Sequence, residues 1–203
     1  LGQVDSALSS MTSQVRRARE LALQGANAGA IGPTAREALA TEVDQIRDGL
    51  IGDANATYAG RPIFGGITSG DKAYAADGTY VGTAGAVERT VAVGTKLRVD
   101  VDGQSAFGVG TGSVFAHLKD LSVALRAGDT TGISQAIDLI GKDGDRITNM
   151  QADAGTRAAR IERSKVRIKR LGYFDDINFE TPPVPGTTDQ ADVDVMMAPA
   201  AAE

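Results

Sequence analysis

The chain has 203 residues, of which 42% are hydrophobic, 4% aromatic and 23% charged, and its formal net charge is -5. With so few aromatic residues and no Trp, the core has to be built from Leu, Ile, Val and Ala, which suits helix packing better than a deep ligand pocket. The absence of Cys excludes disulfides and thiol chemistry, and charges of both signs are interspersed along most of the length, which argues against a nucleic-acid binder.

A helix is predicted at the N-terminal end. From Val4 onward, apolar residues recur at alternating intervals of four and three, so they lie on one face of a helix. This stripe consists of Val4, Leu8, Met11, Val15, Ala18 and Ala22. Glycines between residues 25 and 32 make continued helix costly, and the helix should end there.

A second helix follows at once. Pro33 at a first-turn position marks its start, and Thr34 with Glu37 gives a capping-type signal. Its apolar stripe has the same spacing and consists of Leu39, Val43, Ile46, Leu50 and Ala54. Two such stripes in succession predict an antiparallel helix pair.

A β region is predicted from Tyr58 to about Gly110, where glycine recurs every few residues among alternating apolar positions. The clearest strand covers residues 96–102, in which apolar and charged residues alternate strictly. Asp102 and Gly103 then predict a tight turn.

Helix returns near the middle of the chain and continues toward its end. One helix is predicted from Ser113 to a stop at Gly128, and another from about Thr130. The last helix carries a long stripe made of Ile133, Ile137, Ile140, Ile147, Ala154, Ala158 and Ile161. Its interior includes Gly141 and Gly144. Each of these glycines destabilises the helix by about 1 kcal/mol relative to Ala. The fold class is therefore α+β.

Three segments resemble a known family in their order and spacing. Residues 17–27 (RARELALQGAN) and 33–46 (PTAREALATEVDQI) are similar to the N-terminal rod helices of flagellins, and 55–66 (NATYAGRPIFGG) resembles the hairpin after them. Within the flagellin superfamily the hook-filament junction proteins are the most similar, because of the Phe-Gly-Gly ending at residues 64–66. Three further segments follow in the order expected for the outer domain and returning helix of that group. They are residues 77–82, the strand near Val99 to Phe107, and residues 114–116.

The resemblance extends from residue 1 to about 162 and implies an elongated antiparallel helical rod with an inserted small β domain. The rod would comprise residues 1–66 and 112–162, and the outer β domain residues 67–111. The family implies a structural subunit that joins hook to filament, self-associates head to tail and contacts a neighbouring hook-associated protein and flagellin. It also implies an extracellular location, reached through the flagellar secretion system, with an export chaperone as a further partner.

Residues 163–203 depart from that pattern. Residues 164–195 resemble the last helix and hairpin of a POTRA domain from an outer-membrane β-barrel assembly protein, which would leave an atypical fragment followed by a tail. An isolated hairpin of this kind is only marginally stable in water. Filament flagellin is the alternative function within the superfamily, and an adhesin or an outer-membrane assembly module are alternatives outside it.

Two motifs could carry chemistry, and each has a simpler interpretation. Residues 108–112 place three glycines between a strand and a helix, but Ser113 stands where a phosphate-binding loop requires another glycine. His117 is the only histidine, with Ser113 and Asp120 one turn away on either side. A triad on consecutive turns of one helix cannot form the linear relay of a hydrolase, so we expect a histidine at the surface or in a helix contact.

Other polar groups are also interpreted as structural. Asp143 and Asp145 around Gly144 lack the remaining ligands of a calcium loop, so they are expected to be carboxylates on a helix face. Asn55 begins a weak glycosylation sequon at a helix end. A basic run predicted to be a solvated helix face consists of Arg160, Arg163, Lys165, Arg167, Lys169 and Arg170.

The sequence therefore predicts a structural protein, not an enzyme, without catalytic, cofactor-binding or metal-binding residues. It also predicts no nucleic-acid partner and no membrane insertion. The long stripes leave room for packing between subunits. The residues predicted to contribute to it are Leu8, Met11, Val15, Leu39, Val43, Ile46, Ile140, Ile147 and Ile161.

Overall fold

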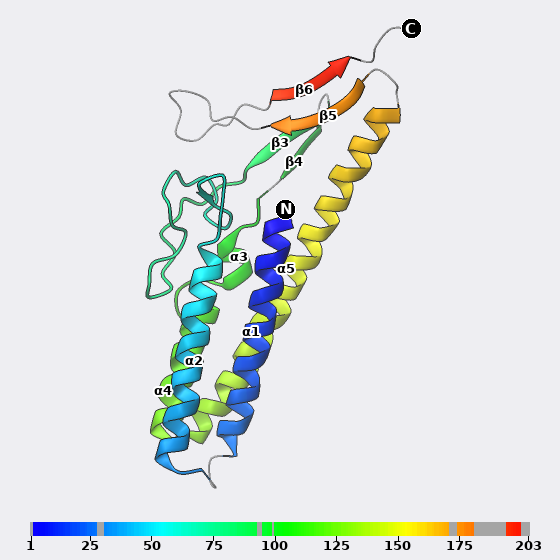
Figure 1. Cartoon of the computed structure of the whole chain (residues 1–203). Helices are drawn as coiled ribbons and strands as arrows, with labels where there is room; N and C mark the ends of the chain where they lie inside the picture. Colours follow the sequence, from blue (N-terminus) through cyan, green and yellow to red (C-terminus); the bar gives the residue numbers. More distant parts are fainter. Residues whose placement is uncertain are drawn as a thin grey trace.

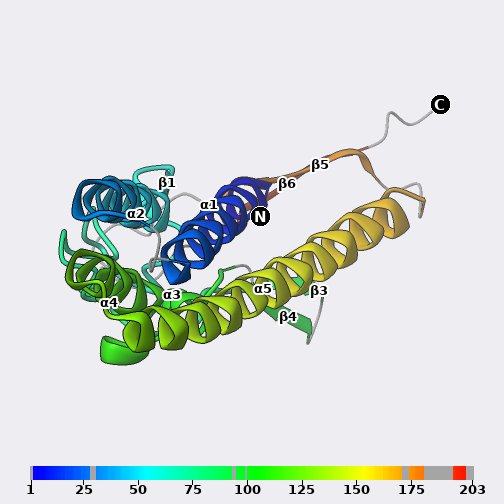
Figure 2. The same ribbon diagram turned by 90° about the horizontal axis from the view of Figure 1, so that it is seen from below.

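The computed structural model describes residues 2–27, 31–92, 95–98, 100–170, 174–180 and 194–199. Its long helices form an elongated bundle of two layers (Figure 1). These are α1 (Gly2–Ala26), α2 (Pro33–Ala54), α4 (Val114–Ala127) and α5 (Thr130–Arg170). Seen from below, α1 and α2 lie over α5 and α4 respectively (Figure 2), and these are the most extensive helix contacts. α1 and α2 run in opposite directions, as predicted.

The predicted apolar stripes form the core of the bundle. Every residue of the α1 stripe is buried, and so are Leu39, Val43, Leu50 and Ala54 of α2. Where α1 ends, a Cβ at Gly25 would overlap the end of the buried Leu125 side chain on α4, so Leu125 would have to shift to admit a larger residue. The bundle is thus held together by short aliphatic side chains packed at close range.

The helix boundaries follow local capping chemistry. The Ser113 side chain accepts a hydrogen bond from the Ala116 amide (3.2 Å) at the start of α4, and Gly128 ends the helix in the left-handed region with φ 68°. Both signals were predicted. The capping signal at Thr34 and Glu37 was wrong, because α2 has Gly32 as its N-cap without a side-chain hydrogen bond, and Pro33 alone marks the start.

The segment between α2 and α4 contains little regular structure. Strands β1 (Thr57–Tyr58) and β2 (Arg61–Pro62) form the hairpin predicted after the second helix. Strands β3 (Glu88–Ala92) and β4 (Thr95–Arg98) form a second antiparallel pair with a register shift. Within the described part of residues 67–111, strand is confined to this pair, apart from isolated bridges. The α+β class therefore overstates the β content: the described chain is mostly a bundle of long helices.

The predicted strand at residues 96–102 and the turn after it were partly wrong. Strand β4 stops at Arg98, and Asp102 is the N-cap of the short helix α3 (Gly103–Phe107), accepting from the Gln104 amide at 3.1 Å. Aspartate is among the best N-cap residues, so the same two residues start a helix instead of a turn. A 3₁₀ turn, η2 (Gly110–Gly112), then leads into α4.

The C-terminal part begins as an extension of the bundle. Helix α5 continues past residue 163 to Arg170, where the sequence pattern predicted a change. Strands β5 (Phe174–Glu180) and β6 (Asp194–Pro199) pair in antiparallel fashion, and the residues between them lie outside the described part of the chain. The division into a rod, an outer domain and a C-terminal fragment stays a prediction.

Candidate functional site

A buried polar cluster lies between α4 and α5. His117 on α4 places its Nδ1 2.6 Å from Oδ2 of Asp143 on α5, and the two side chains are 9% and 2% exposed. The position of His117 in a helix contact agrees with the prediction for it. The prediction for Asp143 as a carboxylate on a helix face was wrong, because it shares the inward face of α5 with Ile140 and Ile147.

Arg146 extends this cluster to the segment outside the bundle. Its guanidinium hydrogen-bonds the second carboxylate oxygen of Asp143 and donates to the carbonyl oxygens of Ala106 and Phe107, each at 3.2 Å. Burial raises the pKa of Asp143, whereas the hydrogen bond with His117 and the charge of Arg146 act in the opposite direction. The cluster therefore links α4, α5 and the end of α3.

The geometry around His117 does not assemble a hydrolase relay. Its carboxylate partner is Asp143, not Asp120. The Ser113 hydroxyl donates to the Gly110 carbonyl oxygen at 2.8 Å while it accepts from the Ala116 amide, so it is occupied by helix capping. No group of three or more His, Asp or Glu side chains in the described chain is arranged to hold a metal ion.

The glycine segment before α4 is closely packed against itself. Gly108 has φ 82°, and a side chain there would collide with the Gly112 carbonyl. Glycine at position 108 thus allows the chain to fold tightly from α3 into η2 and α4.

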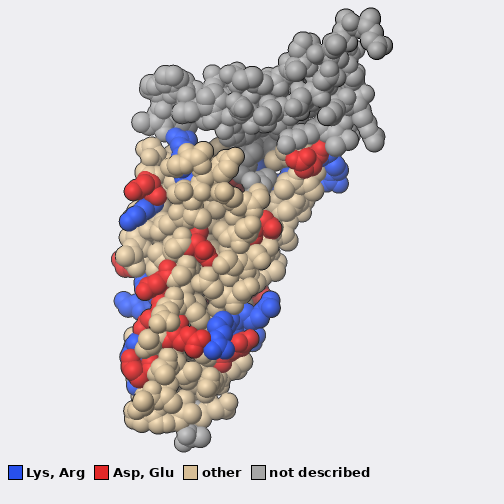
Figure 3. Space-filling model, viewed as in Figure 1, with Lys and Arg blue, Asp and Glu red and all other residues tan. Residues whose placement is uncertain are grey.

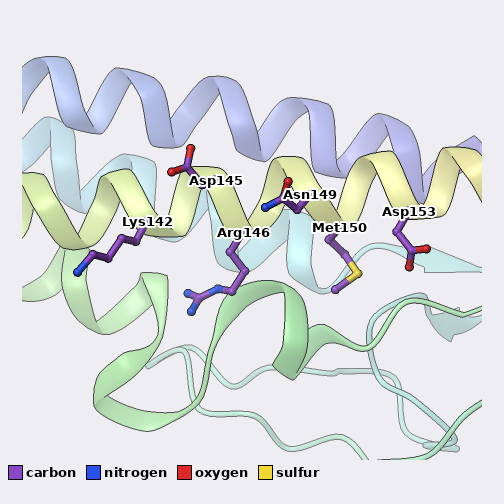
Figure 4. A pocket seen from close by; sticks show the side chains of 6 residues that line it. All are labelled: Lys142, Asp145, Arg146, Asn149, Met150 and Asp153. Carbon is purple, nitrogen blue, oxygen red and sulfur yellow. The ribbon is translucent and has the colours of Figure 1, made fainter.

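An open hollow of about 440 Å³ lies beside this segment (Figure 4). Figure 4 shows Arg146 and Met150 reaching from α5 toward α3, while Asp145 points the other way. The lining residues carry both signs of charge and are Lys142, Asp145, Arg146, Asn149, Met150 and Asp153. Asp145 is exposed, as predicted, and the mixed charges do not select an anion or a cation.

Asn55, the first residue of the sequon, is held in place by hydrogen bonds. Its side chain donates to the Tyr74 carbonyl oxygen and accepts from the amides of Ala73 and Tyr74, each at 2.8 Å. The amide group is therefore used to fix the chain after α2.

Charges on the visible face of the molecule are mixed. Figure 3 shows acidic and basic residues interspersed along the bundle. Of the basic run, Arg160 and Arg163 are exposed on α5, and the side chains beyond residue 163 lie outside the described part. No helix among the described residues is both long enough and apolar enough to span a membrane.

The apolar residues predicted to pack between subunits lie mostly in this chain's own core. Seven of the nine are buried there, whereas Ile46 and Ile161 are only partly buried. The buried ones can reach another subunit only if the bundle rearranges. Their role in subunit packing stays a prediction.

Solved structures show the same arrangement of helices. The crystal structure of Bacillus cereus FlgL matches with a TM-score of 0.74 and 24% sequence identity, covering 84% of this chain and 83% of that one. A crystal structure of Xanthomonas campestris FlgL matches with a TM-score of 0.74 and 16% identity, covering 84% and 89% of the two chains. The chain has the FlgL fold.

A third match carries a related description. A structure described as a flagellar hook-associated protein from Vibrio parahaemolyticus has a TM-score of 0.72 and 19% identity to this chain, over 84% of this chain and 82% of its own. No protein-family model matches the sequence, and no curated protein matches it. The resemblance of residues 164–195 to a POTRA domain is not supported by these comparisons, whereas the FlgL fold extends over most of the chain.

Proposed function

We propose that this chain is a structural subunit of the bacterial flagellum that joins the hook to the filament. The observation that carries the proposal is the FlgL fold over 84% of the chain, at TM-scores of 0.72 to 0.74. The resemblance of residues 17–27, 33–46 and 55–66 to flagellin rod segments supports it independently, since it rests on residue order and not on shape.

The use of the polar side chains supports a building block and not an enzyme. His117, Asp143 and Arg146 hold helices together, and Ser113 caps a helix. Asn55 satisfies backbone groups at the end of α2. Each of these five side chains already has a structural partner, whereas catalysis needs such groups to face a substrate.

The proposed partners follow from the same fold. We place the chain in the flagellum outside the cell, delivered by the flagellar secretion system with the help of an export chaperone. There it contacts copies of itself, a hook-associated protein and flagellin. Filament flagellin is the alternative function, and the descriptions of the matched structures favour the junction over it.

Deletion of the gene tests the proposal. Without a junction, hooks should form and remain bare in electron micrographs, while flagellin accumulates in the culture medium because it is exported and cannot be retained. A copy of the gene supplied in trans should restore filaments. If the chain is instead the filament subunit, bare hooks should appear without flagellin in the medium. Normal filaments on the deletion strain would refute both roles.

A further inference from the structure

A solvent-facing groove runs between α4 and the first turns of α5. We call it the α4–α5 groove, and it encloses about 340 Å³. Its rims carry Val123 and Leu139, which are 58% and 38% exposed and are two of the few large hydrophobic residues exposed in the described chain. Its floor includes Gly132 and Ala136. Small residues on the floor allow another helix to approach closely.

The charges along this groove are of one sign. Asp120 and Asp129 line it, and no Lys or Arg is among its lining residues. An apolar groove edged by carboxylates fits a helix that carries aliphatic and basic side chains. Such a partner would cover the exposed rims and place its cations beside the two acids.

The chain itself contains a segment of this chemistry. Residues 157–170, at the end of α5, include seven Lys or Arg and one Glu, a net charge of +6. Because the whole chain carries -5, the remainder carries -11. Within this segment Arg160 and Arg163 are exposed, and Ile161 between them is partly buried.

One molecule cannot bring these two surfaces together. Ala136 in the groove and Arg163 in the basic segment lie on the same continuous helix α5, 27 residues apart. At 1.5 Å per residue, this separates them by about 40 Å. The groove and the basic segment therefore lie toward opposite ends of the bundle (Figure 1), and contact between them requires two molecules.

We propose that the basic end of α5 in one copy of this chain docks into the α4–α5 groove of a second copy. The contact joins different surfaces on the two copies, so each copy keeps a free groove or a free basic end, and the contact can repeat. This inference rests on the proposed function and deepens it by naming the two surfaces through which copies of the subunit meet.

Two complementary variants of the full chain test the contact. Val123→Lys places a cation in the groove, where it repels the basic end of α5 of another copy. The double substitution Arg160→Glu with Arg163→Glu changes two exposed cations into anions and lowers the net charge of residues 157–170 from +6 to +2. Both sites are exposed, so the fold should persist, and circular dichroism checks this. Val81→Lys is the matched control, because Val81 is 53% exposed and does not line the groove.

Light scattering over a concentration series gives the readout. The average mass of the unmodified chain and of Val81→Lys should rise above the 20.9 kDa of one chain as the concentration increases. Each variant alone should associate at least about tenfold more weakly, because the groove variant sets a cation against the basic end and the basic-end variant sets two carboxylates against Asp120 and Asp129. An equimolar mixture of the two should stop at two chains, since it contains one intact groove and one intact basic end per pair.

Three results would overturn the proposal. The unmodified chain could stay at one chain at every concentration, or Val123→Lys could associate like the unmodified chain. The basic-end variant alone could also associate as strongly as the unmodified chain. This result would mean that a different segment fills the groove and that residues 157–170 bind another anionic ligand. In each case, bare hooks on the deletion strain would leave the proposed function standing, so the two failures are distinguishable.

Discussion

The helical bundle and the segment between α2 and α4 are stabilised in different ways. In the bundle, aliphatic stripes on α1, α2, α4 and α5 meet in one core. The intervening segment depends instead on aromatic rings that pack against the end of the bundle. Phe64 and Phe107 lie 5.0 Å apart between ring centroids, Tyr74 and Phe115 5.1 Å, and Tyr74 and Tyr80 5.3 Å.

Backbone hydrogen bonds explain the difference. A helix satisfies its peptide groups internally, so the bundle needs only an apolar stripe to be stable. The irregular segment leaves peptide groups that side chains must satisfy. Asn55 does this for residues 73 and 74, and Arg47 does it for the carbonyl oxygen of Asp77 (2.5 Å). Arg47 also donates to the Phe115 carbonyl oxygen in the first turn of α4 (3.2 Å), which ties the segment to the bundle. Single side chains in this segment should therefore contribute more to the free energy of unfolding than its low content of strand suggests.

The largest effect is expected from removing the ring at the centre of the aromatic cluster. Phe107 is fully buried and contacts the rings of Phe64, Tyr74 and Phe115. Phe107→Ala should lower the free energy of unfolding by about 3–5 kcal/mol, through lost burial and the cavity left behind. Urea unfolding measures the loss. Val109→Ala is the control, with an effect below about 0.5 kcal/mol, because Val109 is 61% exposed. An equal effect of the two would contradict the role of the cluster.

A smaller effect is expected from the polar anchor at the end of α2. Asn55→Ala removes three hydrogen bonds to the backbone and should lower the free energy of unfolding by about 1–3 kcal/mol. Hydrogen exchange should show faster exchange at the amides of Ala73 and Tyr74, with the bundle amides unchanged. Asn27→Ala is the matched control, since Asn27 is exposed and makes one 3.3 Å bond to the Leu23 carbonyl oxygen. Uniform acceleration across the whole chain would show that Asn55 does not act locally.

The same difference decides how much of the fold the sequence predicts. The stripes of α1 and α2 and the limits of α4 at Ser113 and Gly128 follow from local patterns, and the structure confirms them. Between α2 and α4, local patterns fail because contacts distant in sequence determine the path of the chain. The strand predicted through Asp102 is an example. Apolar and charged residues do alternate there, yet Asp102 begins the short helix α3.

The candidate site was only half predictable. His117 was expected at the surface or in a helix contact, but its partner Asp143 lies 26 residues away and was expected to be a carboxylate on a helix face. A signal was present, because Asp143 falls between Ile140 and Ile147 on the inward stripe of α5. A carboxylate in such a position requires a buried partner, and the only histidine stands on the corresponding face of α4. The hydrogen bonds from Arg146 to the carbonyl oxygens of Ala106 and Phe107 could not be inferred from the sequence, because they depend on the path of the irregular segment.

The smallest effect concerns Asp143, the polar exception inside the aliphatic bundle. Because burial raises its pKa, the folded state binds the proton of this carboxyl more tightly than the unfolded state does. Its contribution to stability is therefore fully present below the ordinary carboxyl pKa of about 4 and is lost as the pH rises through the raised value. The free energy of unfolding of the unmodified chain, relative to Asp143→Asn, should fall as the pH is raised from about 3.5 toward 6.

Urea unfolding of both proteins across this range measures the difference, in which the titrations of the other carboxylates cancel. His117 and Arg146 face position 143 in both proteins, and in the unmodified chain the hydrogen bond with His117 and the charge of Arg146 act on the pKa of Asp143 against burial. A relative stability that rises with pH would mean that these two partners outweigh burial and hold the pKa of Asp143 below its usual value. The sign of the slope thus decides whether desolvation or ion pairing dominates at this buried polar contact between α4 and α5.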